Sequence, residues 1–464
     1  MTMTDHDFSL PMPQGSARRL AVGWLALALY SLIGAGLVVI LILVARMPVI
    51  HDLMPWTGSF KTALVVHVDL SVLVWFLSFA GLLACFNLRE GSGRIGLLAL
   101  GVAATGAVLI TFSPFLGIDA PFMNNYVPVL ENGAFFLGLI LFLAGIGVMS
   151  LYALVVARPS EGWSSGAGAL RLGLRSGLAI LILSLLFWVW SYATLPKGLE
   201  GVSRYEALFW AGGHVLQFTH TQLVIIAWLW LATVAGGAVP LTPRVTAFLL
   251  LLGALPVVVA PFLHGQFAPG DPNFQVGFAD LMKYGGGVAA LPTGLAAFLA
   301  WKKADRASYP PLRVALLLSL VLFGVGGGIG FLIQGVNVTI PSHYHGSIVS
   351  VTVAYMGLTY HLLPALGFQR PDATWATRQL WLYSGGSLLH VFGLAWSGML
   401  GVQRKTAGEA QGLETLVKKV AMGVTGAGGL IAVIGGILFL VLCYRALRKR
   451  NRSDQKQRCQ ALTR

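Results

Sequence analysis

Two histidines, His343 and His345, combine a reactive side chain with an informative spacing. They precede a long apolar stretch, residues 347–368, that is suited to cross a membrane as a helix. An ionisable residue in such a helix is a candidate for function. Residues two apart on an α-helix point about 200° away from each other. This pair therefore suits two different groups on opposite sides of one helix. The alternative is two interfacial histidines that reach toward lipid headgroups.

Composition places the chain among membrane proteins. Of its 464 residues, 56% are hydrophobic and only 10% are charged, whereas soluble domains carry about 25% charged residues. The net charge of +14 is explained by basic loops on one side of a bilayer rather than by binding to nucleic acid. The cysteines Cys85, Cys443 and Cys459 form no paired motif, so neither a disulfide framework nor a covalently attached haem is expected.

The hydrophobic runs predict an all-α integral membrane protein with twelve spans in a single membrane domain, 1–464. The polar start, 1–18, is an N-terminal tail and is not expected to be a cleaved signal peptide. Residues 447–464 form a basic tail. Glycine clusters at 285–287 and 326–328 predict close helix approach. The expected spans are 19–46, 60–87, 94–117, 128–157, 172–195, 204–235, 243–265, 275–301, 312–337, 341–368, 377–402 and 418–446.

Basic residues predict the orientation of the chain. They concentrate at the N-terminus, in the even-numbered connections and in the C-terminal tail, while the ninth connection has none. By the positive-inside rule, both termini lie in the cytoplasm of a cell whose inner membrane the chain crosses repeatedly. Five histidines on four helices then fall at similar depth in the outer half of the membrane. We interpret them as a buried metal or haem cluster; they are His67, His214, His264, His343 and His345.

Several motifs occur in a fixed order along these spans. Span 2 carries His67, span 7 ends in Ala-Pro-Phe-Leu-His264, and span 10 adds His361 to its first two histidines. Three further segments are Leu208-Phe-Trp-Ala-Gly-Gly-His214 in span 6, Leu291-Pro-Thr-Gly in span 8 and His390-Val-Phe-Gly-Leu in span 11. Across nearly its whole length, the chain resembles subunit I of the haem-copper oxidase superfamily, which includes cytochrome c oxidases and nitric oxide reductases.

The resemblance implies a role for each histidine. His67 and His345 would be the axial ligands of a low-spin haem, and His343 the proximal ligand of a high-spin haem on the other face of span 10. His214 and His264 would hold a non-haem copper or iron. Arg404 and Lys405 would neutralise haem propionates at the outer rim; otherwise they are ordinary interfacial side chains.

The chain also departs from the family pattern. Gly265 stands where the family has the second histidine of a pair, so the non-haem metal lacks one expected ligand. Candidates for a replacement are His220, Gln217, Gln266 and Glu131, the last of which could equally line a proton path or lie at the interface. Among these, His220 lies about 9 Å deeper than His214 and about 120° round the helix.

The absence of certain family residues affects which substrate is expected. Phe218 and Val258 occupy the two positions where oxygen-reducing relatives carry their tyrosine, and the usual proton-pumping residues are also absent. Joining two nitric oxide molecules into nitrous oxide requires no tyrosyl donor, so nitric oxide is the favoured substrate. Against this, Tyr344 could approach the site, and reduction of oxygen to water remains the alternative.

A different class of function also fits: a non-catalytic haem protein that transfers electrons or senses a gas. Retention of His214 and His264 argues against it. The expected partners are membrane lipid, the small gas, and a second subunit or donor that is a copper protein, a c-haem protein or quinol.

Overall fold

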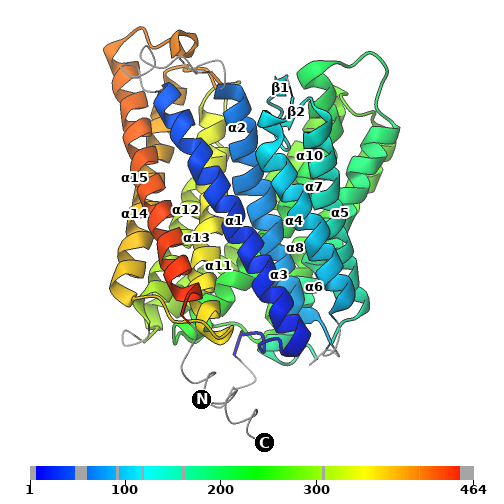
Figure 1. Ribbon diagram of the computed structural model, residues 1–464, viewed down its shortest axis with the longest axis vertical. Coiled ribbons are helices and arrows are strands. Elements are labelled where there is room, and N and C mark those ends of the chain that lie inside the picture. Colours follow the sequence, from blue (N-terminus) through cyan, green and yellow to red (C-terminus); the bar gives the residue numbers. More distant parts are fainter. Residues whose placement is uncertain are drawn as a thin grey trace, which may run out of the picture. The chain divides into compact units, whose positions relative to one another are not determined.

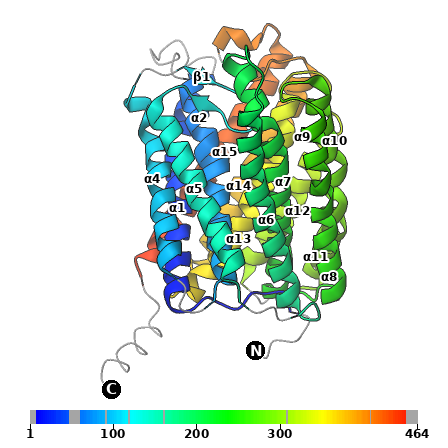
Figure 2. The same cartoon turned by 90° about the vertical axis from the view of Figure 1, so that its right-hand side faces the viewer.

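The structure is a computed structural model that describes residues 7–46, 60–89, 93–117, 120–158, 162–305, 309–406 and 408–449. Long helices dominate these residues (Figure 1, Figure 2). Ten of the helical runs are long and apolar enough to cross a membrane. The predicted class is therefore confirmed: the chain is an all-α, multi-pass membrane protein.

The chain divides into two compact units, which are described separately. The first unit contains residues up to 42, residues 54–230 and residues 239–296. Its helices include the neighbouring pairs α4 with α5 and α6 with α8. In chain order they are α1 (Gly15–Arg46), α2 (Phe60–Val68), α3 (Trp75–Ala84), α4 (Arg94–Phe112), α5 (Gly133–Val155), α6 (Gly166–Ala193), α7 (Gly201–Val234), α8 (Pro243–Ala254), α9 (Ala260–Gln266) and α10 (Pro272–Gly285), followed by the start of α11 (Gly287–Lys303).

The second unit contains residues 43–53, 231–238 and 297–464. It thus holds the last residues of α1 and α7 and the end of α11. Its own helices are α12 (Pro310–Gly330), α13 (Thr339–Ala365), α14 (Ala373–Met399) and α15 (Leu416–Leu447). Here α12 packs along α13, and α14 packs along α15. Figure 1 shows α14 and α15 side by side in orange and red.

Helix occupies all twelve ranges in which a span was predicted. Ten of these ranges meet the length and hydropathy expected of a span, and α14 and the α10–α11 pair do not. The number of membrane crossings therefore remains a prediction. The chain ends, 1–6 and 450–464, lie outside the described residues, and α1 begins within the predicted N-terminal tail.

Some predicted boundaries were wrong for identifiable reasons. Residues 128–132 do not open the fourth span, because Val129–Leu130 pairs with Pro121–Phe122 as a two-stranded sheet, β2 with β1. The helix α5 begins only after Asn132, whose side chain accepts a hydrogen bond from the amide of Phe135. Residues 331–337 likewise lie beyond the end of α12.

Three spans are interrupted in ways that hydropathy cannot reveal. A π-helical turn, Asp69–Val74, separates α2 from α3. A 3₁₀ segment, Leu255–Val259, separates α8 from α9; it contains Pro256, which lacks the amide that an α-helix needs. The eighth range is broken at Gly286, between α10 and α11. Such interruptions often lie near functional sites.

In each of the two glycine clusters, 285–287 and 326–328, one glycine lies where another segment of the chain packs closely against it. A Cβ at Gly326 in α12 would lie 2.7 Å from the backbone of Gly346 in α13. A Cβ at Gly285 would lie 2.8 Å from Pro256. Gly327 and Gly328 face open space instead, so only some of these glycines are required for helix contact.

Candidate functional site

His67 lies in the last turn of α2, immediately before the π-helical turn. Its Nδ1 is 3.1 Å from the main-chain oxygen of Ala35 in α1. The two helices approach closely there, since a Cβ at Gly34 would lie 2.7 Å from the side chain of Leu70. The small residue in α1 thus allows the imidazole of His67 to reach that helix.

His343 is positioned by the glycine-rich end of α12. Its Nδ1 lies 2.7 Å from the carbonyl oxygen of Gly326. A Cβ at Gly330 would lie 2.7 Å from the same ring nitrogen. Two glycines one helical turn apart therefore provide the acceptor for the ring and the space it occupies.

His345 points to a different neighbour. Its Nδ1 is 2.7 Å from the carbonyl oxygen of Pro341 in its own helix. Its ring lies 4.9 Å from that of His390 in α14, and Tyr344 stacks on it at the same distance. The two histidines of α13 thus face α12 and α14 respectively, as their two-residue spacing predicted.

These histidines share one hydrogen-bond arrangement. A carbonyl oxygen can only accept, so Nδ1 of each ring carries the proton and Nε2 carries the lone pair. Histidines that bind metals generally make this kind of bond, which fixes the tautomer and the orientation of the ring. His67, His343 and His345 therefore fit ligation of haem iron through Nε2.

His214 has the same arrangement within an aromatic pocket of the first unit. Its Nδ1 is 2.9 Å from the carbonyl oxygen of Trp210, and the residue is only 4% exposed. The rings of Trp210 and Tyr126 lie 4.7 Å and 4.8 Å from the imidazole. A Cβ at Gly213 would clash with the ring of Tyr126. The glycine before His214 therefore makes room for a tyrosine from another segment.

Sequence reasoning missed Tyr126, which a short turn holds in place. The side-chain oxygen of Asn124 accepts hydrogen bonds from the amides of Tyr126 and Val127, at 3.0 Å and 2.9 Å, as in an Asx turn. Asn125 binds the carboxylate of Glu206 in α7, its amide at 2.9 Å. Burial raises the pKa of Tyr126 well above its usual value, and the charge of Glu206 raises it further. The phenol is therefore protonated at neutral pH.

His264 has a different environment. Its Nε2 lies 3.0 Å from the hydroxyl of Ser191 in α6. Its ring stacks on Trp190 at 4.1 Å. Its Nδ1 is enclosed and has no hydrogen-bond partner among the described residues. To bind a metal through Nε2, His264 would have to release Ser191.

Three of the four proposed replacement ligands make contacts of their own. His220 faces the ring of Phe76 in α3 at 5.0 Å, and Glu131 accepts a hydrogen bond from Tyr205 at 3.0 Å. Gln217 accepts a bond through its main-chain oxygen from Thr221. Within the described part of the chain, no three His, Cys, Asp or Glu residues form a group that could hold a metal. Glutamine is not among these four residue types, so the ligand set of the non-haem metal stays a prediction.

Arg404 and Lys405 lie in the turn after α14, and both make contacts in the structure. Lys405 has a φ of 60°, a left-handed conformation that is uncommon for residues other than glycine. In the same region the main chain of Val338, just before α13, bonds to that of Val402 at 3.1 Å. This bond connects the chain near Arg404 to the start of the helix that carries His343.

Comparison with known proteins identifies relatives over most of the chain. An uncharacterized protein of Rickettsia prowazekii is 30% identical across 92% of this chain and 96% of its own length. An uncharacterized protein of Aquifex aeolicus is 30% identical across 74% of this chain and 85% of its own. The chain belongs to one family with these proteins. No protein-family model matches it.

Two further likenesses involve proteins with a described role. Cytochrome c oxidase subunit 1 of Thermus thermophilus is 26% identical across 83% of this chain and 76% of its own length. A solved heme-copper terminal oxidase dimer has the same fold, with a TM-score of 0.73 over 93% of this chain and 84% of that chain, at 15% identity. The chain is therefore similar to subunit I of the haem-copper oxidases in sequence, and it shares the fold of a heme-copper terminal oxidase.

These similarities bear on the interpretation of the histidines. One of these similar proteins is named as a cytochrome c oxidase subunit and the other as a heme-copper terminal oxidase. His67 and His214 belong to the first unit, and His343 and His345 belong to the second. The pairing of histidines from different units on one haem therefore remains a prediction from the resemblance.

Proposed function

We propose that the chain is the haem-carrying catalytic subunit of a membrane terminal reductase whose substrate is nitric oxide. The observation that carries the proposal is the bond from Nδ1 to a carbonyl oxygen in His67, His343 and His345. It leaves the Nε2 lone pair of each ring directed away from that carbonyl. When bound, the haems would carry electrons and bind the gas.

The residues around His214 support a site for a small molecule. The imidazole lies among aromatic rings, at 6.2 Å from Phe278 as well as beside Trp210 and Tyr126. This largely apolar surround excludes water, which protects reactive intermediates from side reactions. No step is assigned to a non-haem metal, because no three of the described His, Cys, Asp and Glu residues form a group that could hold one.

Nitric oxide is favoured by the residues at the two family tyrosine positions. Phe218 packs in an aromatic core with Val257 and Phe278, and Val258 is 59% exposed. Neither side chain can donate an electron and a proton. Joining two nitric oxide molecules to nitrous oxide and water takes two electrons and two protons, fewer than the four of each that oxygen requires.

One observation favours oxygen as a second candidate. Tyr126 lies against His214, where a phenol could supply the hydrogen atom that the absent family tyrosine would give. Oxygen reduction would then rely on a tyrosine from the β1–β2 turn.

Gas consumption by the purified, reduced protein tests both candidates. We expect nitric oxide to be consumed with release of nitrous oxide, and Tyr126→Phe to retain this activity. If oxygen is the substrate, Tyr126→Phe should slow its reduction by about tenfold or more, equivalent to about 1.4 kcal/mol of transition-state stabilisation. Rapid reduction of oxygen to water without turnover of nitric oxide would refute the nitric oxide proposal. A reduced protein that binds no carbon monoxide would refute both.

A further inference from the structure

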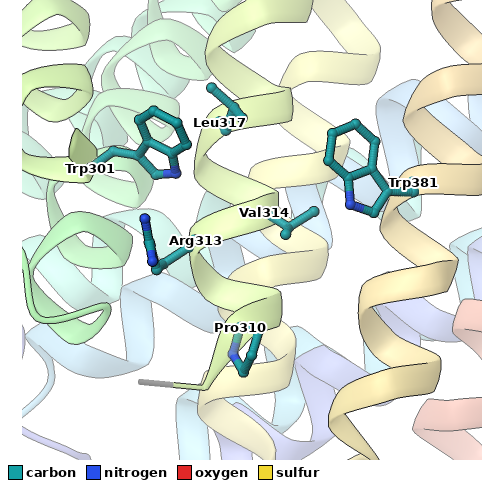
Figure 3. A pocket seen from close by; sticks show the side chains of 6 residues that line it. All are labelled: Trp301, Pro310, Arg313, Val314, Leu317 and Trp381. Atoms are coloured by element: carbon teal, nitrogen blue, oxygen red, sulfur yellow. The ribbon is translucent and has the colours of Figure 1, made fainter. Parts of the chain in front are cut away.

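An open groove lies on the second unit, between the end of α11 and the outer faces of α12 and α14 (Figure 3). Its volume is about 190 Å³. Two tryptophans form its opposite walls, and one arginine is its only charged lining residue. The lining residues are Trp301, Pro310, Arg313, Val314, Leu317 and Trp381.

The arginine stacks on one wall of the groove, and no ion pair to it is found among the described residues. The guanidinium of Arg313 lies over the indole of Trp301, 5.8 Å from the ring centroid, and Figure 3 shows the two side chains together. Its Nε is enclosed and has no hydrogen-bond partner among the described residues. An arginine stacked in this way keeps a planar fork of donors that matches the oxygens of a phosphate.

The surrounding charges are predominantly positive. Lys302 and Lys303 follow Trp301 directly and are exposed. Arg378 lies over Trp375 at 5.1 Å and precedes Trp381 by three residues, which places both on one face of α14. Nearby Asp372 is engaged in capping α14, where it accepts a hydrogen bond from the amide of Trp375.

The groove also lies where a lipid headgroup is expected. Tryptophans gather at the membrane–water interface, and basic residues mark its cytoplasmic side. The inner leaflet on that side carries anionic lipids, which basic clusters attract. Trp381 is 51% exposed and Leu317 lines the inner part of the groove, so an acyl chain has an apolar surface to follow.

We propose that this groove binds an anionic phospholipid, with the headgroup phosphate on Arg313 and the glycerol backbone and upper acyl chain between Trp301 and Trp381. An uncharged or zwitterionic lipid would pack against the apolar walls, but it would not neutralise the positive charge of Arg313 and the basic residues around it. The site is therefore selective for net negative charge. It is independent of the substrate reduced elsewhere in the chain.

Native mass spectrometry of the purified full chain in detergent tests the site. Added phosphatidylglycerol should bind in preference to phosphatidylcholine. Arg313→Gln should lower phosphatidylglycerol binding about five- to tenfold, as expected for loss of a charge-assisted contact. Arg313→Lys should keep much of the preference, which separates loss of charge from damage to the fold. Trp381→Leu should weaken binding while retaining selectivity.

The matched control is Arg244→Gln, at an exposed arginine near the start of α8 that is predicted to lie on the same membrane side. It should leave binding unchanged. An equal loss in the Arg313 and Arg244 variants would overturn the proposal, as would equal binding of the two lipids. Displacement of bound lipid by an uncharged quinone, with no preference for phosphatidylglycerol, would assign the groove to an electron donor instead.

Discussion

A histidine in a membrane helix needs partners for both ring nitrogens, because lipid offers none. In His67, His214, His343 and His345, the protein satisfies Nδ1 with a carbonyl oxygen. His220 lacks this bond, and its Nδ1 is enclosed without a partner among the described residues. His264 resembles His220 in this respect although it is a predicted ligand, and Nδ1 of His390 lies 2.8 Å from the carbonyl oxygen of Thr425 without a predicted ligand role. The bond therefore fits a ligand role but does not assign one by itself.

This difference gives a prediction for haem content. His67→Ala should lose one of the two expected haems, because no other side chain on α2 could replace the imidazole. His220→Ala is the matched control: it removes a buried histidine of the same unit and should retain both haems. The measurement is haem per polypeptide by the pyridine haemochrome method. Full haem content in His67→Ala would show that His67 is not an axial ligand.

Membership of the candidate site could be predicted only for residues that belong to a recognisable sequence motif. The histidine positions followed from spacing and resemblance, and the opposite directions of His343 and His345 followed from helix geometry alone. Tyr126 was not predictable, because its contact with His214 joins a turn to a distant helix. The only local signal was Asn124, a residue typical of turns. Likewise, nothing in the sequence showed that His264 would bond to Ser191.

Helices were predictable where the sequence contains a long apolar run. The apolar runs located helix in all twelve ranges, since a helix that crosses lipid must satisfy its own backbone over about 20 residues. The interruptions were not predicted, because hydropathy does not register a change from α to π or 3₁₀ hydrogen bonding. Pro256 and the glycine run that contains Gly286 were the visible signs of a break.

The pairing of α14 with α15 depends on two glycines that face each other. A Cβ at Gly386 would lie 2.8 Å from the carbonyl oxygen of Gly428, and a Cβ at Gly428 would lie 2.7 Å from that of Gly386. Gly428→Leu should therefore separate the helices and destabilise the protein by about 1–3 kcal/mol or more, the usual cost of overpacking. The thermal unfolding midpoint in detergent measures the effect.

Gly426→Leu is the control within the same helix. A Cβ there meets no atom within 4 Å, so the leucine should project into open space and leave the midpoint nearly unchanged. Equal destabilisation by both variants would mean that glycine acts through backbone flexibility in α15 rather than through helix contact.

For the whole molecule, the distribution of charge predicts the topology. Arg445, Arg448 and Lys449 end α15 on the side predicted to be cytoplasmic, together with the basic end of α11. The connection between α12 and α13, residues 331–338, contains no lysine or arginine. Lysine and arginine in short loops resist translocation, so this asymmetry favours one orientation of the chain.

The last prediction concerns that orientation. Green fluorescent protein fused after residue 464 should fluoresce, because it folds in the cytoplasm. Alkaline phosphatase fused after residue 336 should be active, because it needs the outer compartment. A phosphatase fusion after residue 304, in the basic connection that follows α11, is the control and should be inactive. An active phosphatase at residue 304 with an inactive one at residue 336 would invert the topology. The groove on Arg313 would then face the outer leaflet, which would remove the anionic inner leaflet as a reason for its basic residues.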